Sequence, residues 1–147
     1  MKRILLAGLS FMIALHSFAA FMLPVDTSLE QAFHRNFPDA TDVRWTEEVD
    51  GYSVSFVDKG IRTRVTFDKK GKFNGELRNY TAQYLPFYLT NLLKQQYPRY
   101  EVIGVTEVTS ATDINYFVKV MGPKYWMTIR LENDGNTSVV ERYRKAD

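Results

Sequence analysis

The sequence predicts an α+β fold in which two tandem helix-plus-antiparallel-meander repeats form one sheet, with both helices on the same face. Three patterns support this prediction: apolar stripes with helical spacing that end at an aromatic-proline pair, runs of alternating polar and apolar residues, and the return of both patterns about 60 residues later. Two such units bury their helix stripes and sheet faces when their strands join into one sheet.

The N-terminus has the pattern of a secretory signal peptide. A short basic start is followed by an apolar run over residues 4–15 and by small residues at the −3 and −1 positions before a cut after Ala19. The apolar run is too short to span a bilayer of about 30 Å. We therefore expect residues 1–19 to be removed and residues 20–147 to form a single exported domain. A cut one residue later, or retention of the segment as a membrane anchor, are the alternatives.

Charge and cysteine content exclude several functional classes. The chain has 19 basic and 17 acidic residues, and Lys2 and Arg3 leave with the signal peptide, so the exported chain is near neutral. This balance gives no electrostatic reason to expect nucleic acid or an acidic membrane as partner. The chain has no cysteine, which excludes disulfides, thiolate metal ligands and a cysteine nucleophile.

The first helix is predicted from a stripe formed by Leu29, Phe33 and Phe37. Thr27 followed three residues later by glutamate is a capping box, so we expect Thr27 to be the N-cap. Pro38 disfavours helical geometry in the residue before it, which ends the helix at the aromatic residue.

The second helix repeats this pattern before Pro98. Its stripe consists of Leu85, Leu89, Leu92, Leu93 and Tyr97. Pro86 is expected in the first turn, where its missing N–H costs nothing.

The strands are predicted from alternation between turn signals such as Asp-Gly, Lys-Gly and Gly-Pro. In the first repeat the apolar face is formed by Tyr52, Val54, Phe56, Ile61, Thr63, Val65 and Phe67. In the second it is formed by Tyr116, Val118, Val120, Tyr125, Met127, Ile129 and Leu131. Val43 and Trp45 open the first strand and are expected to face the first helix. Weaker strands at 75–80 and 139–144 complete repeats at about 27–80 and 85–144.

No set of residues predicts catalysis, a metal site or a cofactor site. His34 is the single histidine left after signal removal, so no catalytic triad or zinc site can be assembled around histidines. The acidic residues cluster at predicted hairpin turns, where such residues are expected without any catalytic role; these are Glu47, Glu48, Asp50, Glu132 and Asp134. The lysines of the hairpin at 69–72 indicate a solvated loop. We expect a protein that is not an enzyme.

The outward face of the sheet gives the candidate binding residues. In the first repeat this face is polar and includes Arg44, whereas the second repeat places three apolar side chains there. Aromatic residues, methionine and arginine are enriched in recognition patches. The predicted partner-binding residues are Phe117, Met121, Trp126, Arg62, Arg64 and Arg130. The alternative is that the last strand, the linker around Tyr80 and Tyr84, or sheet twist covers the apolar residues.

A family resemblance rests on the helix followed by "NFPDATDVRW", "GYSVSF" and "TFDKKGK", and on the later "YLP" and "LLKQQYPRYEVIGV". Over essentially the whole exported chain, these motifs resemble the PepSY-like proteins exported by Bacteroidetes, which have a fold like that of the β-lactamase inhibitory protein. The resemblance implies a periplasmic or otherwise extracytoplasmic location and an inhibitor-like or binding role.

The expected function is therefore an exported, non-enzymatic binding module that recognises an exported protein or a peptide through the open sheet face. We expect no nucleic acid partner and no stable membrane insertion after signal cleavage. The first alternative is a periplasmic carrier or sensor of a small amphipathic ligand held between helices and sheet. The second is an enzyme that acts on carbohydrate through two acidic side chains.

Overall fold

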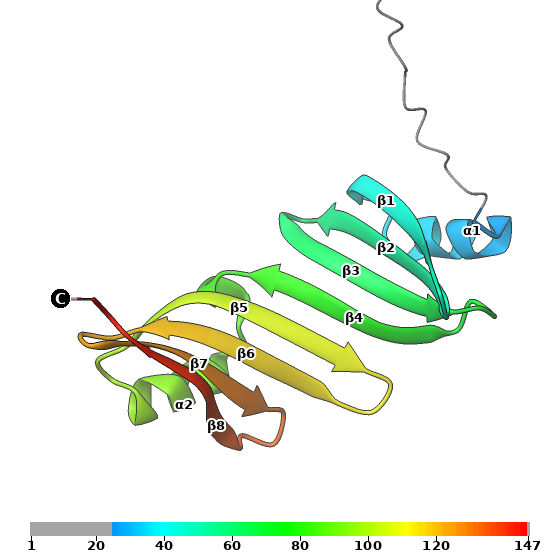
Figure 1. Ribbon diagram of the computed structural model, residues 1–147. Coiled ribbons are helices and arrows are strands. Elements are labelled where there is room, and N and C mark those ends of the chain that lie inside the picture. The colour runs from blue at the N-terminus through cyan, green and yellow to red at the C-terminus, as the bar shows by residue number, and fades with distance from the viewer. Residues whose placement is uncertain (1–24, 147) are drawn as a thin grey trace, which may run out of the picture.

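The computed structural model describes residues 25–146, and the expected signal peptide lies outside this range. Each helix is followed by four strands, as Figure 1 shows. The first set is α1 (Thr27–Asn36), β1 (Thr41–Glu48), β2 (Gly51–Asp58), β3 (Ile61–Asp68) and β4 (Phe73–Tyr80). A short 3-10 helix, η1 (Ala82–Tyr84), leads to the second set: α2 (Phe87–Gln96), β5 (Glu101–Ser110), β6 (Ile114–Met121), β7 (Tyr125–Glu132) and β8 (Thr137–Arg144).

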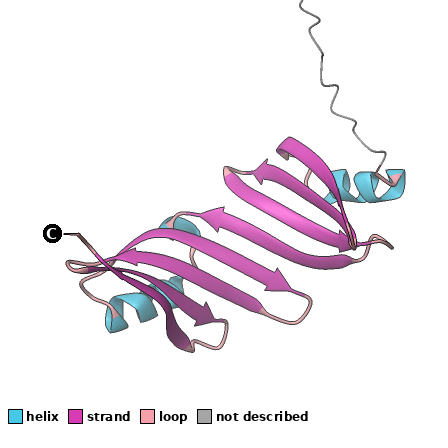
Figure 2. Ribbon diagram, in the orientation of Figure 1, coloured by secondary structure: helices cyan, strands magenta, loops and turns pink. Residues whose placement is uncertain are grey.

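The eight strands form one antiparallel sheet in sequence order, and β4 pairs with β5 at its centre. Both helices lie on one face of this sheet (Figure 2). The register explains this arrangement. Val65 of the first core pairs with Glu76, and Tyr80, four residues further along β4, pairs with Val105 of the second core. Directly paired residues share a face, so both cores lie on the same side of the sheet. The predicted α+β fold is confirmed.

The start of α1 corrects one prediction. The N-cap is Asp26, not Thr27, which is the first residue of the helix. The Asp26 carboxylate accepts a hydrogen bond from the Ser28 N–H at 2.8 Å and another from the Ser28 hydroxyl at 2.7 Å. These bonds lower the pKa of Asp26 below its ordinary value. Aspartate is a strong N-cap because its carboxylate satisfies the free N–H groups of the first turn, and here it takes the role that the capping box gave to threonine.

The start of α2 differs in the opposite direction: α1 begins one residue earlier than expected, whereas α2 begins later, at Phe87, with Pro86 as its N-cap. Pro86 precedes the first turn, and its carbonyl accepts a hydrogen bond from the Thr90 N–H at 3.0 Å. The helix ends are alike, as the aromatic-proline pairs predicted: Phe37 and Tyr97 leave helical geometry, yet each donates its N–H to the carbonyl four residues earlier. The chain therefore turns from helix to strand in the same way twice.

Two apolar cores lie between the helices and the sheet. In the first core the buried residues are Phe33, Val54, Phe56 and Val65, with Phe37, Val43, Trp45 and Phe67 packed around them. The second core contains Leu85, Leu89, Leu93, Val105, Val118, Val120, Met127, Ile129 and Leu131, among others. Most residues of the predicted helix stripes and strand faces pack here, but Leu29, Tyr52 and Thr63 belong to neither core, and Ile61 of the first repeat packs in the second core. Among residues 25–146, no helix has the length and apolar character needed to cross a bilayer.

Candidate functional site

All six predicted binding residues lie on the face of the sheet on which no helix of residues 25–146 lies, which we call the open face. Arg62 pairs across the strands with Asn79, Asn79 with Thr106, Thr106 with Phe117, and Phe117 with Arg130. This row runs from β3 to β7, and Met121 and Trp126 form a second pair on the same face. The register separates the candidates into two groups, because β4 and β5 lie between Arg62 or Arg64 and the apolar residues.

The apolar residues form a patch at the β6–β8 end of the open face. Trp126 is 40% exposed and pairs with Tyr143, which is 62% exposed, while Phe117 and Met121 are half-buried. We define the apolar patch as Phe117, Met121, Trp126 and Tyr143. Lys145 adds a cation over the Trp126 ring, with Nζ 5.3 Å from the ring centroid. The patch thus combines exposed aromatic surface with an adjacent positive charge.

The structure places two of the elements that were considered as possible covers, the last strand and Tyr80. Strand β8 extends the sheet beside β7, and Tyr80 packs into the second core on the helix side. Tyr143 itself was missed by sequence reasoning because of a bulge. Ile129 pairs with Val139, but the next ladder partner of β7, Thr128, pairs with Glu141, so Val140 is the extra residue. A bulge reverses the alternation of the residues after it. Tyr143 therefore lies on the open face, whereas unbroken alternation would place it on the helix side with Val139.

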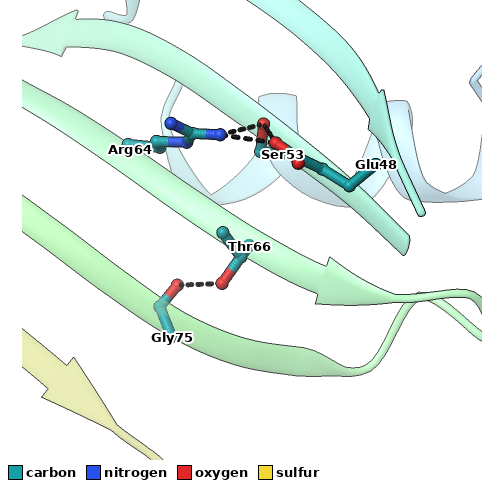
Figure 3. A network of polar contacts seen from close by, with 5 residues as sticks. All are labelled: Glu48, Ser53, Arg64, Thr66 and Gly75. Atoms are coloured by element: carbon teal, nitrogen blue, oxygen red, sulfur yellow. Dashed lines mark hydrogen bonds and ion pairs between the residues drawn. The ribbon is translucent and has the colours of Figure 1, made fainter. Parts of the chain in front are cut away.

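The predicted arginines have different surroundings. Arg64 forms an ion pair with Glu48 and donates to the Ser53 hydroxyl at 3.2 Å, as Figure 3 shows. Arg130 donates to the side-chain oxygen of Asn115 at 3.0 Å and forms an ion pair with Glu132 at 3.1 Å. Arg62 is exposed and forms no ion pair with any residue in the range 25–146.

The Arg64 network buries Ser53, which was expected to be exposed on the outward face of the sheet. This outward-facing serine is only 2% exposed, because Glu48 and Arg64 cover it and its hydroxyl donates to the Glu48 carboxylate at 2.9 Å. Thr66, further along β3, donates its hydroxyl to the Gly75 carbonyl at 3.3 Å (Figure 3). Side-chain bonds of this kind hold the polar half of the open face in place.

A depression of about 580 Å³ lies on the open face over β1–β4. Its polar lining includes Asp42, Arg44, Ser55, Arg62, Arg64 and Asn79, and Val57 and Leu77 add apolar surface. Arg44 was not among the predicted binding residues. Its outward orientation could be read from alternation, but its place beside Arg62 and Arg64 depends on the pairing of β1 with β2 and of β2 with β3.

The residues considered for catalysis do not come together. His34 is exposed on α1, and its ring forms a T-shaped pair with the Phe33 ring, with centroids 5.3 Å apart. Glu47, Glu48 and Asp50 lie at the β1–β2 turn, whereas Glu132 and Asp134 lie at the β7–β8 turn, as the turn interpretation predicted. Over the described part of the chain, no group of three or more His, Cys, Asp or Glu side chains is placed to hold a metal ion.

A polar cluster on the helix side separates the two cores and was not predicted. The Tyr80 hydroxyl donates to the Glu107 carboxylate, which also pairs with Arg78 at 3.4 Å. Glu76 lies 3.9 Å from Arg78. Burial raises the pKa of Glu76, and burial together with the bond to Glu107 raises the pKa of Tyr80. Burial likewise raises the pKa of Tyr116. The cluster joins β4 to β5 and is structural in its contacts.

We compared the chain with family models, curated proteins and solved structures. No family model matches the chain, and no curated protein matches its sequence. Among solved structures, a BLIP-like protein from Bacteroides fragilis NCTC 9343 aligns over 85% of this chain and 91% of its own, with a TM-score of 0.62 and 16% identity. The fold of this chain is BLIP-like.

Two further structures agree with this assignment. A DUF2874 family protein from Bacteroides uniformis ATCC 8492 covers 82% of this chain and 89% of its own, with a TM-score of 0.59 and 19% identity. A proposed periplasmic protein from Bacteroides eggerthii DSM 20697 covers 80% and 87%, with a TM-score of 0.59 and 20% identity. At these identities the similarity establishes the fold. The PepSY-like assignment from the sequence stays a prediction.

Proposed function

We propose that this protein is an exported, non-enzymatic binding module, PepSY-like and inhibitor-like, that recognises a protein or a peptide through the open face. The observation that carries the proposal is the apolar patch. Its exposed rings lie on a sheet face that neither helix of the described chain covers, next to polar strands whose side chains are held by hydrogen bonds. Aromatic side chains on such a surface lose water-exposed area when a partner binds.

The location proposed for this function is the periplasm or another extracytoplasmic compartment. The signal-peptide pattern at residues 1–19 supports it, and so does the similarity to a proposed periplasmic protein. To test export, the protein is produced in its native host and its intact mass is measured. A chain that begins at Ala20 is expected, and an uncleaved chain would contradict the proposed location. We also propose that residues 20–147 form one domain that consists of two repeats.

The carrier alternative places a small amphipathic ligand between helices and sheet. That space is packed in the described structure: Leu89, Val118 and Ile129 are all 0% exposed. The contacts therefore favour recognition on the open face. Native mass spectrometry of the freshly purified protein tests the alternative directly, since a carrier would retain ligand mass.

The experiment for the proposed function compares pull-downs. The chain from Ala20 with a C-terminal tag, exported in its own host, is captured under mild salt as the wild type, as Trp126→Ser and as Phe87→Ser. Phe87 is the matched control because it is 79% exposed at the start of α2, on the helix side. We expect a partner that Trp126→Ser loses and Phe87→Ser retains. A partner retained by Trp126→Ser would remove the patch from the interface.

A further inference from the structure

The depression over β1–β4 brings three guanidinium groups into one place. Arg44 and Arg64 both pair with Ser55, one from each neighbouring strand, so their Cα atoms lie about 10 Å apart. Arg62 is two residues along β3 from Arg64, a distance of about 7 Å. All three line the same depression. Side chains as long as arginine can therefore reach one bound group from two directions.

The charges in the depression are not balanced internally. Asp42 is the one acidic residue in its lining, against three arginines. Arg64 is engaged with Glu48, but Arg44 and Arg62 form no ion pair within residues 25–146. A guanidinium presents five N–H donors in a planar fork that matches both oxygens of a carboxylate. The guanidinium groups of Arg44 and Arg62 are therefore available to bind an anion.

We propose, on the basis of the proposed function, that the open face binds an acidic segment of a protein partner. Carboxylates of this segment bind Arg44 and Arg62, and apolar side chains of the same segment bind the apolar patch. The register supplies the spacing. Arg62 on β3 and Phe117 on β6 belong to one cross-strand row, so they lie three strand spacings, or about 14 Å, apart. An extended chain covers that distance with about four residues.

The surface between the two sites favours a peptide over an anionic polysaccharide. The row from Arg62 to Phe117 passes through the polar pair Asn79 and Thr106. Leu77 and Val108 pair with each other in the neighbouring row, and Leu77 is 37% exposed, so the surface between the depression and the patch is partly apolar. A polysaccharide supplies carboxylates but no apolar side chains for this surface. An acidic segment with apolar residues matches both chemistries.

The test uses a capped peptide with two glutamates, a Gly-Ser-Gly-Ser spacer and a Phe-Leu pair, and a second peptide with glutamines in place of the glutamates. Binding to the exported chain is measured by NMR titration at low salt. We expect the glutamate peptide to bind about tenfold more tightly than the glutamine peptide, as two exposed ion pairs allow. The preference is expected to shrink at high salt, because salt screens exposed charges.

Two double variants locate the effect. Arg44→Gln with Arg62→Gln removes the free forks and is expected to abolish the preference for glutamate. Arg35→Gln with Arg99→Gln makes the same change of charge at exposed residues outside the open face and is expected to preserve it. NMR amide spectra check that both variants fold. We expect both to fold because all four arginines are exposed.

Several outcomes would overturn the inference. Equal binding of the two peptides, absence of binding by either, or an unchanged preference in the Arg44/Arg62 variant would each do so. An oligogalacturonate that binds these arginines more tightly than the peptide would assign the depression to a polysaccharide instead. If both peptides bind equally and Trp126→Ser weakens both, the acidic specificity fails while the proposed function stands.

Discussion

The two halves of the open face differ in chemistry although their strands have the same order. The β1–β4 half presents Arg44, Ser55 and Arg62, whereas the β5–β8 half presents Phe117 and Trp126. On the helix side, both halves place apolar residues under a helix. The helix side must bury apolar surface to stabilise either half, but the open face is free of that constraint. The two halves therefore differ most on the face where no packing requirement keeps them alike.

The cores under the helices also differ. In the first half, aromatic rings fill the space: Phe33 and Phe37 lie 4.9 and 4.7 Å from the ring centroid of Phe56. In the second half, aliphatic side chains such as Leu89 and Ile129 do so and are fully buried. The same topology thus tolerates two different fillings, provided that the apolar volume is supplied.

The largest effect is expected from removing the central ring of the aromatic core. Phe33 is 3% exposed and contacts the rings of Trp45 and Phe56, so Phe33→Ala should lower the free energy of unfolding by about 3–5 kcal/mol. Urea unfolding measures it. Phe87→Ala, at a highly exposed position, is the control and should change stability by less than about 0.5 kcal/mol. A loss below about 1 kcal/mol for Phe33→Ala would mean that the aromatic core is not tightly packed.

The next effect tests whether the halves unfold together. Leu89 is fully buried on α2, and Leu89→Ala should cost about 2–5 kcal/mol. The β4–β5 ladder makes the sheet continuous, so hydrogen exchange should accelerate in β2 as well as in β6. Acceleration confined to the second half would show that each half is its own unfolding unit.

A smaller effect is expected at the polar cluster between the cores. Glu107→Ala leaves the Tyr80 hydroxyl without its partner and Arg78 with Glu76 alone, which should lower stability by about 1–3 kcal/mol in thermal or urea unfolding. Glu132→Ala breaks a more exposed pair with Arg130 and should cost less than about 1 kcal/mol. Equal losses in the two variants would contradict the structural role of the cluster.

The smallest effect concerns pH. Burial raises the pKa of Glu76 above its ordinary 4.5, with Glu107 and Asp58 adding to the shift and Arg78 opposing it. The native state therefore binds this proton more tightly than the unfolded state, and the resulting stability is present below pH 4.5 and lost as pH rises through the native pKa. Glu76→Gln should thus gain stability relative to wild type between pH 4 and pH 7, by less than about 1 kcal/mol.

Urea unfolding at both pH values measures the difference between Glu76→Gln and wild type. A variant whose stability relative to wild type falls over this interval would show that the pair with Arg78 outweighs burial at Glu76.

Local patterns predicted most of the fold. The stripe of Leu29 and Phe33 and the strict alternation of β2, β3, β6 and β7 identified the elements, because burial of one face imposes the period. The exact helix starts were less predictable. Asp26 and Thr27 are both good capping residues, and neighbouring positions compete with small differences in free energy.

The candidate site was less predictable. Sequence alternation identified Phe117, Met121 and Trp126 as outward-facing. It missed Tyr143 because a bulge reverses the alternation in β8. It also missed the proximity of Arg44 to Arg62, because that depends on which residues face each other across strands.

The sequence by itself determined the elements, their order and the apolar face of most strands, since helix and strand periodicities are local properties of the chain. Tertiary structure decided which side chains meet: the arginines of the depression, the Trp126–Tyr143 pair, and the contacts of Glu107 with Tyr80 and Arg78. The physical reason is that these contacts depend on strand register, on the position of bulges and on packing between strands, which the alternation of residues within a single strand does not specify.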